Sequence, residues 1–228
     1  MFTYKWYADF IHTGMEEGVT FFLRHDIDIS LAKAVEMAEF ESKNNFHSTY
    51  YVLMSSPFYN TFDPENLERI RMIRQLGMGV GLHYDLSIMD SSLKSTSSEI
   101  AVQIGLLEYH VGKLDGLSVT FHRPLRGKAP DEELVELLNE NQIYVPDFDS
   151  RFKYISDSGH NWREDPFQAI KDFDFVHVNT HPEWYNTKEK SMEDCLYGLK
   201  LEQQMDKLVT KQVNSMHEYL ERVKKKKK

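Results

Sequence analysis

The stretch VTFFLRHDID, residues 19–28, joins an apolar run to charged side chains near its end. Val19, Phe21 and Phe22 are β-branched or aromatic, a composition that favours a buried strand. Ser30 follows and can cap a helix that begins at Leu31. The stretch therefore predicts a buried strand that ends in polar residues and leads into a helix.

The same order of strand and helix repeats along the chain. Further strands are expected at residues 47–54, 78–85, 117–122 and 173–180, weaker strands at 142–145 and 152–155, and helices at 31–40, 64–76, 97–113, 131–141 and 192–223. This alternation predicts a mostly parallel sheet covered by helices in a single α/β domain. An α/β barrel is expected, with an open doubly wound sheet as the alternative; no strand is followed by a glycine-rich phosphate loop, which weakens a nucleotide-binding version of the open sheet. We expect the last strand to lie beside the first.

The composition indicates one large domain with an acidic surface. The 228 residues are 41% hydrophobic and 13% aromatic, enough to fill a sizeable core. Residues 1–223 are assigned to the domain, and the five lysines at 224–228 to a disordered, solvated tail. The net charge is −9; without those five lysines, 22 of the 27 basic residues remain against 36 acidic ones, which gives −14. Such a charge argues against nucleic-acid partners and anionic membranes.

The cysteine content and the N-terminus bear on the compartment. Cys195 is the single cysteine, so it has no internal disulfide partner and no metal-ligand spacing. The first residues lack the apolar core of a signal peptide, and no run of about 18 apolar residues predicts a membrane span. We therefore expect a cytoplasmic protein.

Charged residues gather where the first strand ends. Asp26 and Asp28 are two residues apart, so on a strand their side chains share one face, and Arg24 shares it too. Two carboxylates in one pocket repel each other unless a metal ion or another cation lies between them. A purely structural arrangement is the alternative, with Asp28 as a helix cap and Asp26 paired with Arg24. His25 faces the other way and is expected to be a hydrogen-bonded buried histidine.

Histidines follow two later strands. His83 ends the strand at 78–85 and, together with Asp28, would supply the nitrogen and oxygen ligands that suit zinc or another first-row divalent ion. His181 ends the last strand and can reach a substrate there, whereas His177 lies deeper on the same face and is expected to be structural. The carboxyl ends of barrel strands are where α/β barrels place their active sites.

Five motifs in order resemble a known family. They are Arg24-His25-Asp26-x-Asp28, Gly81-Leu82-His83-Tyr84-Asp85, His122-Arg123-Pro124, the segment from Tyr154 through Asp157 to Trp162, and Thr180-His181-Pro182-Glu183-Trp184. Together they resemble a divergent branch of the polysaccharide deacetylases, carbohydrate esterase family 4, over residues 21–185. The resemblance implies a distorted (β/α)₇ barrel that uses a divalent metal ion, with zinc expected, to remove acetyl groups from sugar polymers.

The resemblance also assigns roles by position. It implies that Asp26 is the general base, that Asp28 and His83 are metal ligands, and that His181 is the general acid. Residues expected to contact the substrate are Arg24, Tyr84, Arg123, Asp157, Trp162 and Trp184. Trp162 and Trp184 would form a wall on which a sugar stacks, although a tryptophan is more often part of the core.

Three departures from the family pattern concern the metal site. Ile27 separates the two aspartates that are adjacent in the family, Ser87 stands where the family has a second histidine ligand, and His122 precedes the arginine of the third motif. One hypothesis repairs the site: His122 becomes the third ligand, and Arg24 or Arg123 orients the base.

The predicted function is therefore that of a metal-dependent hydrolase that removes an acetyl group from an N-acetylated carbohydrate. Two alternatives stay open. One is a catalytically inactive relative that keeps a carbohydrate-binding pocket, which the serine at position 87 favours. The other is a metal-dependent hydrolase of a non-sugar amide, since the same barrel chemistry suits any C–N hydrolysis.

Overall fold

The computed structural model describes residues 1–88, 93–114, 116–122, 132–201, 209–210 and 212–217. The chain divides into two compact units, Met1–Lys190 and Ser191–Lys228. The described strands all belong to the first unit, which is a single α/β domain; the second contains α7 (Met192–Gly198). The extent of the predicted domain, 1–223, remains a prediction, and its lysine tail lies outside the described residues.

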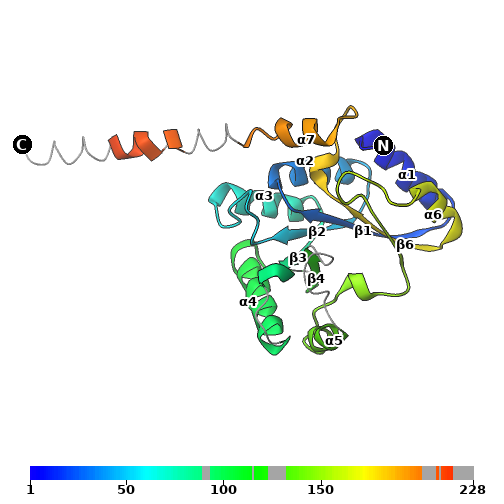
Figure 1. The fold of residues 1–228 in the computed structure, drawn as a ribbon, viewed down its shortest axis with the longest axis horizontal. Helices are drawn as coiled ribbons and strands as arrows, with labels where there is room; N and C mark the ends of the chain where they lie inside the picture. The colour runs from blue at the N-terminus through cyan, green and yellow to red at the C-terminus, as the bar shows by residue number, and fades with distance from the viewer. Residues whose placement is uncertain (89–92, 115, 123–131, 202–208, 211, 218–228) are drawn as a thin grey trace, which may run out of the picture. The chain divides into compact units, whose positions relative to one another are not determined.

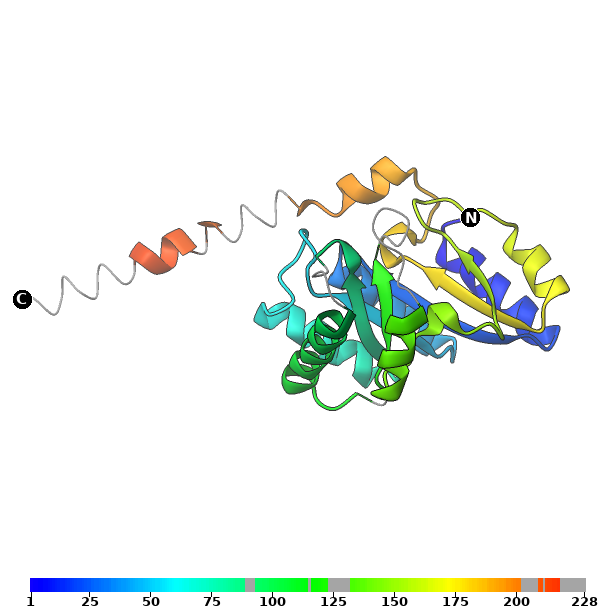
Figure 2. The same ribbon diagram turned by 60° about the horizontal axis from the view of Figure 1, so that its bottom comes forward.

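The sheet has six parallel strands in the order β4-β3-β2-β1-β6-β5 (Figure 1). Their bounds are β1 (Thr20–Ile27), β2 (Ser48–Leu53), β3 (Gly79–Asp85), β4 (Val119–His122), β5 (Lys153–Ser156) and β6 (Phe175–Thr180). β6 pairs with β1 along its whole length, which confirms that the last strand lies beside the first. Figure 2 shows the sheet curling from β6 and β1 round to β3 and β4.

The α/β barrel prediction is confirmed in an open form. The described residues give six strands that curl into a half-barrel, with β4 and β5 as its edges, rather than the seven of the expected (β/α)₇ form. The weak strand expected at residues 142–145 contributes only an isolated bridge between Ser118 and Tyr144. The described part of the sheet is therefore not closed by pairing between β4 and β5.

Helices follow the strands and cover the convex face of the sheet. They are α1 (Tyr4–Glu16), α2 (Leu31–Lys43), α3 (Pro64–Gln75), α4 (Leu93–Val111), α5 (Glu132–Glu140) and α6 (Pro166–Asp172), with short 3₁₀ turns η1 (Leu86–Ile88), η2 (Pro146–Phe148) and η3 (Pro182–Trp184). Ser30 caps α2 by accepting from the backbone N–H of Lys33, as expected. Within the described ranges, no helix has the length and apolar character needed to cross a membrane.

One helix was not anticipated. α1 precedes the first strand and buries Tyr7, Phe10, Ile11 and Gly14, a spacing of three and four residues that is typical of a helix with one apolar face. Thr3 caps it by accepting from the N–H of Trp6. α1 lies against α6 (Figure 1), so it covers the end of the sheet formed by β1 and β6.

Candidate active site

β1 delivers acidic side chains to the concave face of the sheet. Asp26 lies within the strand and is 2% exposed, and Asp28 follows directly after the strand with its side chain 20% exposed. Alternation along a strand puts both on the same face as Arg24, as expected. Thus β1 fixes three ionic groups in a row at the carboxyl edge of the sheet.

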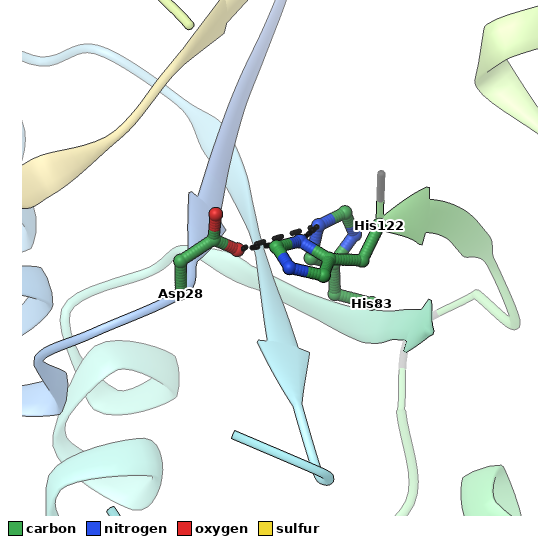
Figure 3. Close-up of side chains that lie close together, drawn as sticks. All are labelled: Asp28, His83 and His122. Atoms are coloured by element: carbon green, nitrogen blue, oxygen red, sulfur yellow. Dashed lines mark hydrogen bonds and ion pairs between the residues drawn. The ribbon is translucent and has the colours of Figure 1, made fainter. Parts of the chain in front are cut away.

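Two histidines from β3 and β4 reach Asp28. Oδ1 of Asp28 lies 3.4 Å from Nε2 of His83 and 3.2 Å from Nδ1 of His122, and these two nitrogens are 3.2 Å apart. The three ligand atoms lie within 4.8 Å of one another (Figure 3). Asp28, His83 and His122, here called the metal cluster, come together as the sequence predicted.

The atoms of the metal cluster fit a divalent cation. Nδ1 of His83 pairs with Oγ1 of Thr120 at 2.8 Å, which leaves Nε2 facing the cluster. Oδ1 of Asp28 is buried and receives no well-directed hydrogen bond from the described residues, despite the nearby nitrogens. Burial lowers the pKa of His83, so its imidazole is neutral as a ligand must be. One carboxylate and two imidazoles form a donor set that suits zinc and similar ions.

Asp26 is held in a fixed position beside the metal cluster. Nε and Nη2 of Arg24 each lie 2.7 Å from one of its oxygens, and Nδ2 of Asn179 donates to Oδ2 at 3.0 Å. Burial acts to raise the pKa of Asp26, but Arg24 and His83 outweigh it and hold the pKa well below its usual range. Oδ2 also lies 3.6 Å from Nε2 of His83, so this ionised carboxylate borders the cluster.

Arg24 is a buried arginine that pairs with Asp26 and with a second carboxylate. Its side chain is 2% exposed, and Nη1 pairs with Asp147, which follows Pro146 in η2. Arg24 was expected to contact substrate, but both ends of its guanidinium are occupied by carboxylates. Its pairing with Asp26 is the contact expected of the residue that orients the base. Arg123 itself lies outside the described residues.

His181 and Asp157 form a second ionic pair across from the metal cluster. Nδ1 of His181 lies 2.6 Å from Oδ1 of Asp157, and Oδ2 of Asp157 accepts from the His181 backbone N–H at 3.2 Å. Nε2 lies 3.8 Å from Oδ2 of Asp28. Burial acts to lower the pKa of His181, but Asp157 raises it well above its usual value. His181 is therefore a protonated imidazole facing Asp28, and Asp157 holds that imidazole rather than lining a pocket directly.

Glu183 is a site neighbour that sequence reasoning missed. It lies in η3, two residues after His181, and is 2% exposed. Burial raises its pKa to about 8, with His181 lowering it and Asp28 raising it. Its Oε2 has no hydrogen-bond partner among the described residues. The Thr-His-Pro-Glu-Trp motif contains this glutamate, but nothing in the motif indicates that a turn after the strand would bury it.

The aromatic residues expected to bind a sugar are mostly buried. Trp162 is 8% exposed and packs against Trp6 and Phe10 of α1, with ring centroids 5.7 and 6.5 Å away. Trp184 is 6% exposed and meets His160 edge to face at 5.4 Å. Both therefore pack within the domain, and their role in substrate binding remains a prediction that this placement does not favour.

Residues next to His83 on β3 point elsewhere. The Tyr84 hydroxyl donates to Glu99 of α4 at 3.0 Å, on the face of the sheet opposite to His83. Asp85 accepts from the backbone N–H of Ser87 at 2.8 Å and so caps the turn after β3. Tyr84 was expected to contact substrate, and its orientation towards α4 does not favour that role.

Comparison with known proteins relates this arrangement to one fold. No family model and no curated protein matches the sequence. A solved CE4 family pseudoenzyme from Bacillus anthracis aligns with a TM-score of 0.53 at 14% identity, covering 81% of this chain and 61% of that one. The chain has the CE4 fold. A mutant of the pseudoenzyme with restored enzymatic activity aligns with the same TM-score and identity, over 81% of this chain and 63% of that one.

A CE4 esterase from Streptococcus mutans shares the fold as well. It aligns with a TM-score of 0.51 at 13% identity, covering 77% of this chain and 79% of that one. This chain spans less than two thirds of the length of the pseudoenzyme structures. The likeness confirms the CE4 architecture that the sequence motifs predicted.

Proposed function

We propose that this chain is a metal-dependent hydrolase that removes an acetyl group from an N-acetylated carbohydrate. One observation carries the proposal: Asp28 lies between the two histidines of the metal cluster and a protonated His181, at the carboxyl edge of a CE4-type sheet. Zinc is the proposed ion because one carboxylate and two imidazoles suit it. When bound by Asp28, His83 and His122, the ion would supply an acidified water and stabilise negative charge on the acyl oxygen.

Asp26 is the proposed proton acceptor. Its carboxylate is ionised and borders the cluster, and Arg24 and Asn179 fix its plane. A base that is held in one orientation does not populate rotamers in which it cannot reach the attacking water. This is the usual benefit of a positioned catalytic group. We expect Arg24 to hold Asp26 rather than to touch the sugar.

His181 is the proposed proton donor. An amine leaves an amide poorly as a bare anion, so the departing nitrogen needs a proton during bond cleavage. Asp157 keeps His181 charged and directs its Nε2 towards the metal cluster. The donor and the acceptor thus come from different strand ends, β6 for His181 and β1 for Asp26.

A catalytically inactive carbohydrate-binding relative is the second candidate function. Two observations favour it: a pseudoenzyme is among the structures that share the fold, and Ser87 occupies the position of the family's second histidine ligand. In the structure Ser87 belongs to η1 and its backbone pairs with Asp85. His122 stands in the place that a third ligand would need, which favours a working metal site.

The test is acetate release by the full chain loaded with zinc. Oligomers of N-acetylglucosamine are the first substrates, and a simple N-acetylated amine tests hydrolysis of a non-sugar amide. We expect release from the oligomers that a chelator abolishes and that zinc restores. Zinc-loaded protein that binds the oligomers without releasing acetate would favour the inactive relative, and release from the simple amide alone would favour the amide hydrolase.

A further inference from the structure

One exposed aromatic residue is linked directly to the proposed base. Tyr154 lies on edge strand β5 and is 44% exposed. Nδ2 of Asn179 donates both to Oη of Tyr154 and to Oδ2 of Asp26, each at 3.0 Å. The two oxygens therefore lie within about 6 Å of each other, since each is 3.0 Å from the same nitrogen. Tyr154 thus presents an open ring next to the proposed reaction centre.

The orientation of the Asn179 amide is determined by its partners. A carboxylate cannot donate, so the NH₂ group of Asn179 must face Asp26, and the carbonyl oxygen must point away. That oxygen is buried and accepts no hydrogen bond from any residue that the structure describes. A buried acceptor without a donor is destabilising. The unsatisfied carbonyl oxygen accompanies an amide orientation in which both N–H groups of Asn179 are used, one for Asp26 and one for Tyr154.

The ring of Tyr154 packs against an aromatic side chain of the neighbouring strand. His177, on the neighbouring strand β6, meets it edge to face with centroids 5.0 Å apart, and Phe22 of β1 meets His177 at 4.9 Å. Burial, with Arg24 adding to it, lowers the pKa of His177 to about 3, so its ring is neutral and behaves as an aromatic surface. With this backing from His177, Tyr154 remains 44% exposed on edge strand β5.

The hydroxyl of Tyr154 can donate a hydrogen bond to a ligand. Its oxygen accepts from Asn179, and its own proton has no acceptor among the described residues. An exposed aromatic ring with a polar tip is suited to a sugar, which offers an apolar face together with hydroxyl and amide groups. The two tryptophans that the sequence suggested for this task are buried, at 8% and 6% exposure.

We propose that Tyr154, held in place by Asn179, is the aromatic residue on which the N-acetylated sugar rests beside Asp26. The ring stacks on the sugar and the hydroxyl donates to one of its oxygens. This assignment rests on the proposed function for its substrate class. It locates the sugar at the open edge formed by β5, and it makes Asn179 a positioning residue that serves both the base and the sugar contact.

The experiment measures binding and turnover separately. Calorimetry with the tetramer of N-acetylglucosamine is carried out on the zinc-loaded full chain carrying His181→Ala, which slows turnover. Adding Tyr154→Phe should weaken binding about tenfold, the value of one lost hydrogen bond. Tyr154→Ala should weaken it further. Tyr144→Phe is the matched control: this tyrosine is 38% exposed and its hydroxyl donates to Asp149, so the affinity should not change.

Asn179→Ala completes a double-mutant cycle with Tyr154→Phe. If Asn179 acts on the sugar through the Tyr154 hydroxyl, the double variant should bind about tenfold more weakly than the parent, no worse than Tyr154→Phe alone. A hundredfold loss in the double variant would contradict that link. Equal affinity of Tyr154→Phe and the parent, or no binding of the tetramer at all, would overturn the assignment.

Turnover distinguishes this inference from the proposed function. With His181 intact, Tyr154→Phe should raise KM for the tetramer, whereas Tyr144→Phe should leave KM for the tetramer unchanged. Binding that depends on Tyr154, together with no acetate release from wild-type protein, would remove the hydrolase proposal and support the sugar contact.

Discussion

The two faces of β1 carry two buried ionic clusters that differ in one respect. On the convex face, Glu41 of α2 is fully buried and accepts from His25, Tyr7, Ser48 and Tyr50 at 2.5 to 2.8 Å. Both of its oxygens have two donors. On the concave face, Oδ1 of Asp28 and Oδ1 of Asn179 are buried without a well-directed hydrogen bond from the described residues.

This difference in hydrogen-bond satisfaction indicates which of the two clusters has a group that a bound ligand would satisfy. Buried polar groups in folded proteins are nearly always satisfied, and exceptions call for a physical explanation. The convex cluster, centred on Glu41, satisfies itself and joins β1 to α1, α2 and β2, so its role is structural. The concave cluster leaves Oδ1 of Asp28 and Oδ1 of Asn179 without a hydrogen bond from the described residues. An ion bound by Asp28, His83 and His122 would satisfy the Asp28 oxygen.

His181→Ala is expected to give the largest effect on the concave side. A general acid typically contributes about 10²–10⁴-fold to the rate, so acetate release from N-acetylated sugar should fall by that factor. An activated ester should suffer much less, because its leaving group needs no proton. Steady-state rates on both substrates measure the difference. An equal loss on both would mean that His181 does not act as the proton donor.

On the convex side, Glu41→Ala should lower the stability of the fold and should not act on the reaction itself. It removes a buried carboxylate from His25 and leaves three hydroxyl groups unsatisfied, which should cost about 3–5 kcal/mol of unfolding free energy. Denaturant unfolding measures the loss. Glu41→Gln is the milder variant if the alanine protein does not fold. Folded Glu41→Gln with wild-type stability but no metal binding would contradict the division between the two faces.

Zinc should stabilise the protein through the concave cluster alone. At free zinc about 100-fold above Kd, the gain in unfolding free energy should be about 2.7 kcal/mol. Thermal unfolding with zinc and with a chelator measures this gain, which should persist in Glu41→Gln and vanish in His122→Ala. Stabilisation of His122→Ala to the same extent would remove His122 from the proposed ligand set.

The pH dependence of stability gives a smaller effect on the convex side. Burial acts to raise the pKa of Glu41, but His25 and the hydroxyl donors outweigh it and hold the pKa below its ordinary value of 4.5. The resulting stabilisation is present above that ordinary value and is lost as the pH falls through the lower folded-state pKa. The stability difference between wild type and Glu41→Gln should therefore shrink below about pH 4.5. A difference that grows on acidification would contradict the assignment of an ionised Glu41.

The sequence predicted the parts of this comparison that depend on strand alternation. Because side chains alternate along β1, Asp26 and Asp28 were expected on one face and His25 on the other as a hydrogen-bonded histidine. The structure confirms both: His25 contacts Glu41 and Thr180 on the convex side. Because parallel strands end at the same edge of the sheet, His83 was also expected near Asp28, and the family resemblance suggested His122 as the third ligand.

Features that depend on contacts between distant segments could not be predicted from the sequence. Asp147 pairs with Arg24 from 123 residues away, on a short turn whose position no local pattern specifies. Trp162 looked like a sugar platform by type, but it is buried because α1, which was not anticipated, packs on it. Burial of Glu183 likewise results from packing of η3 against α2 and β1.

Metal analysis of the purified protein tests the central claim most directly. After loading with zinc and removal of excess ion, elemental analysis should find one zinc per wild-type chain and none in His83→Ala. His177→Ala is the control, because this histidine lies deeper on the concave face and is no part of the metal cluster, so it should retain one zinc. Full zinc occupancy in His83→Ala would contradict the assignment of Asp28, His83 and His122 as the metal site.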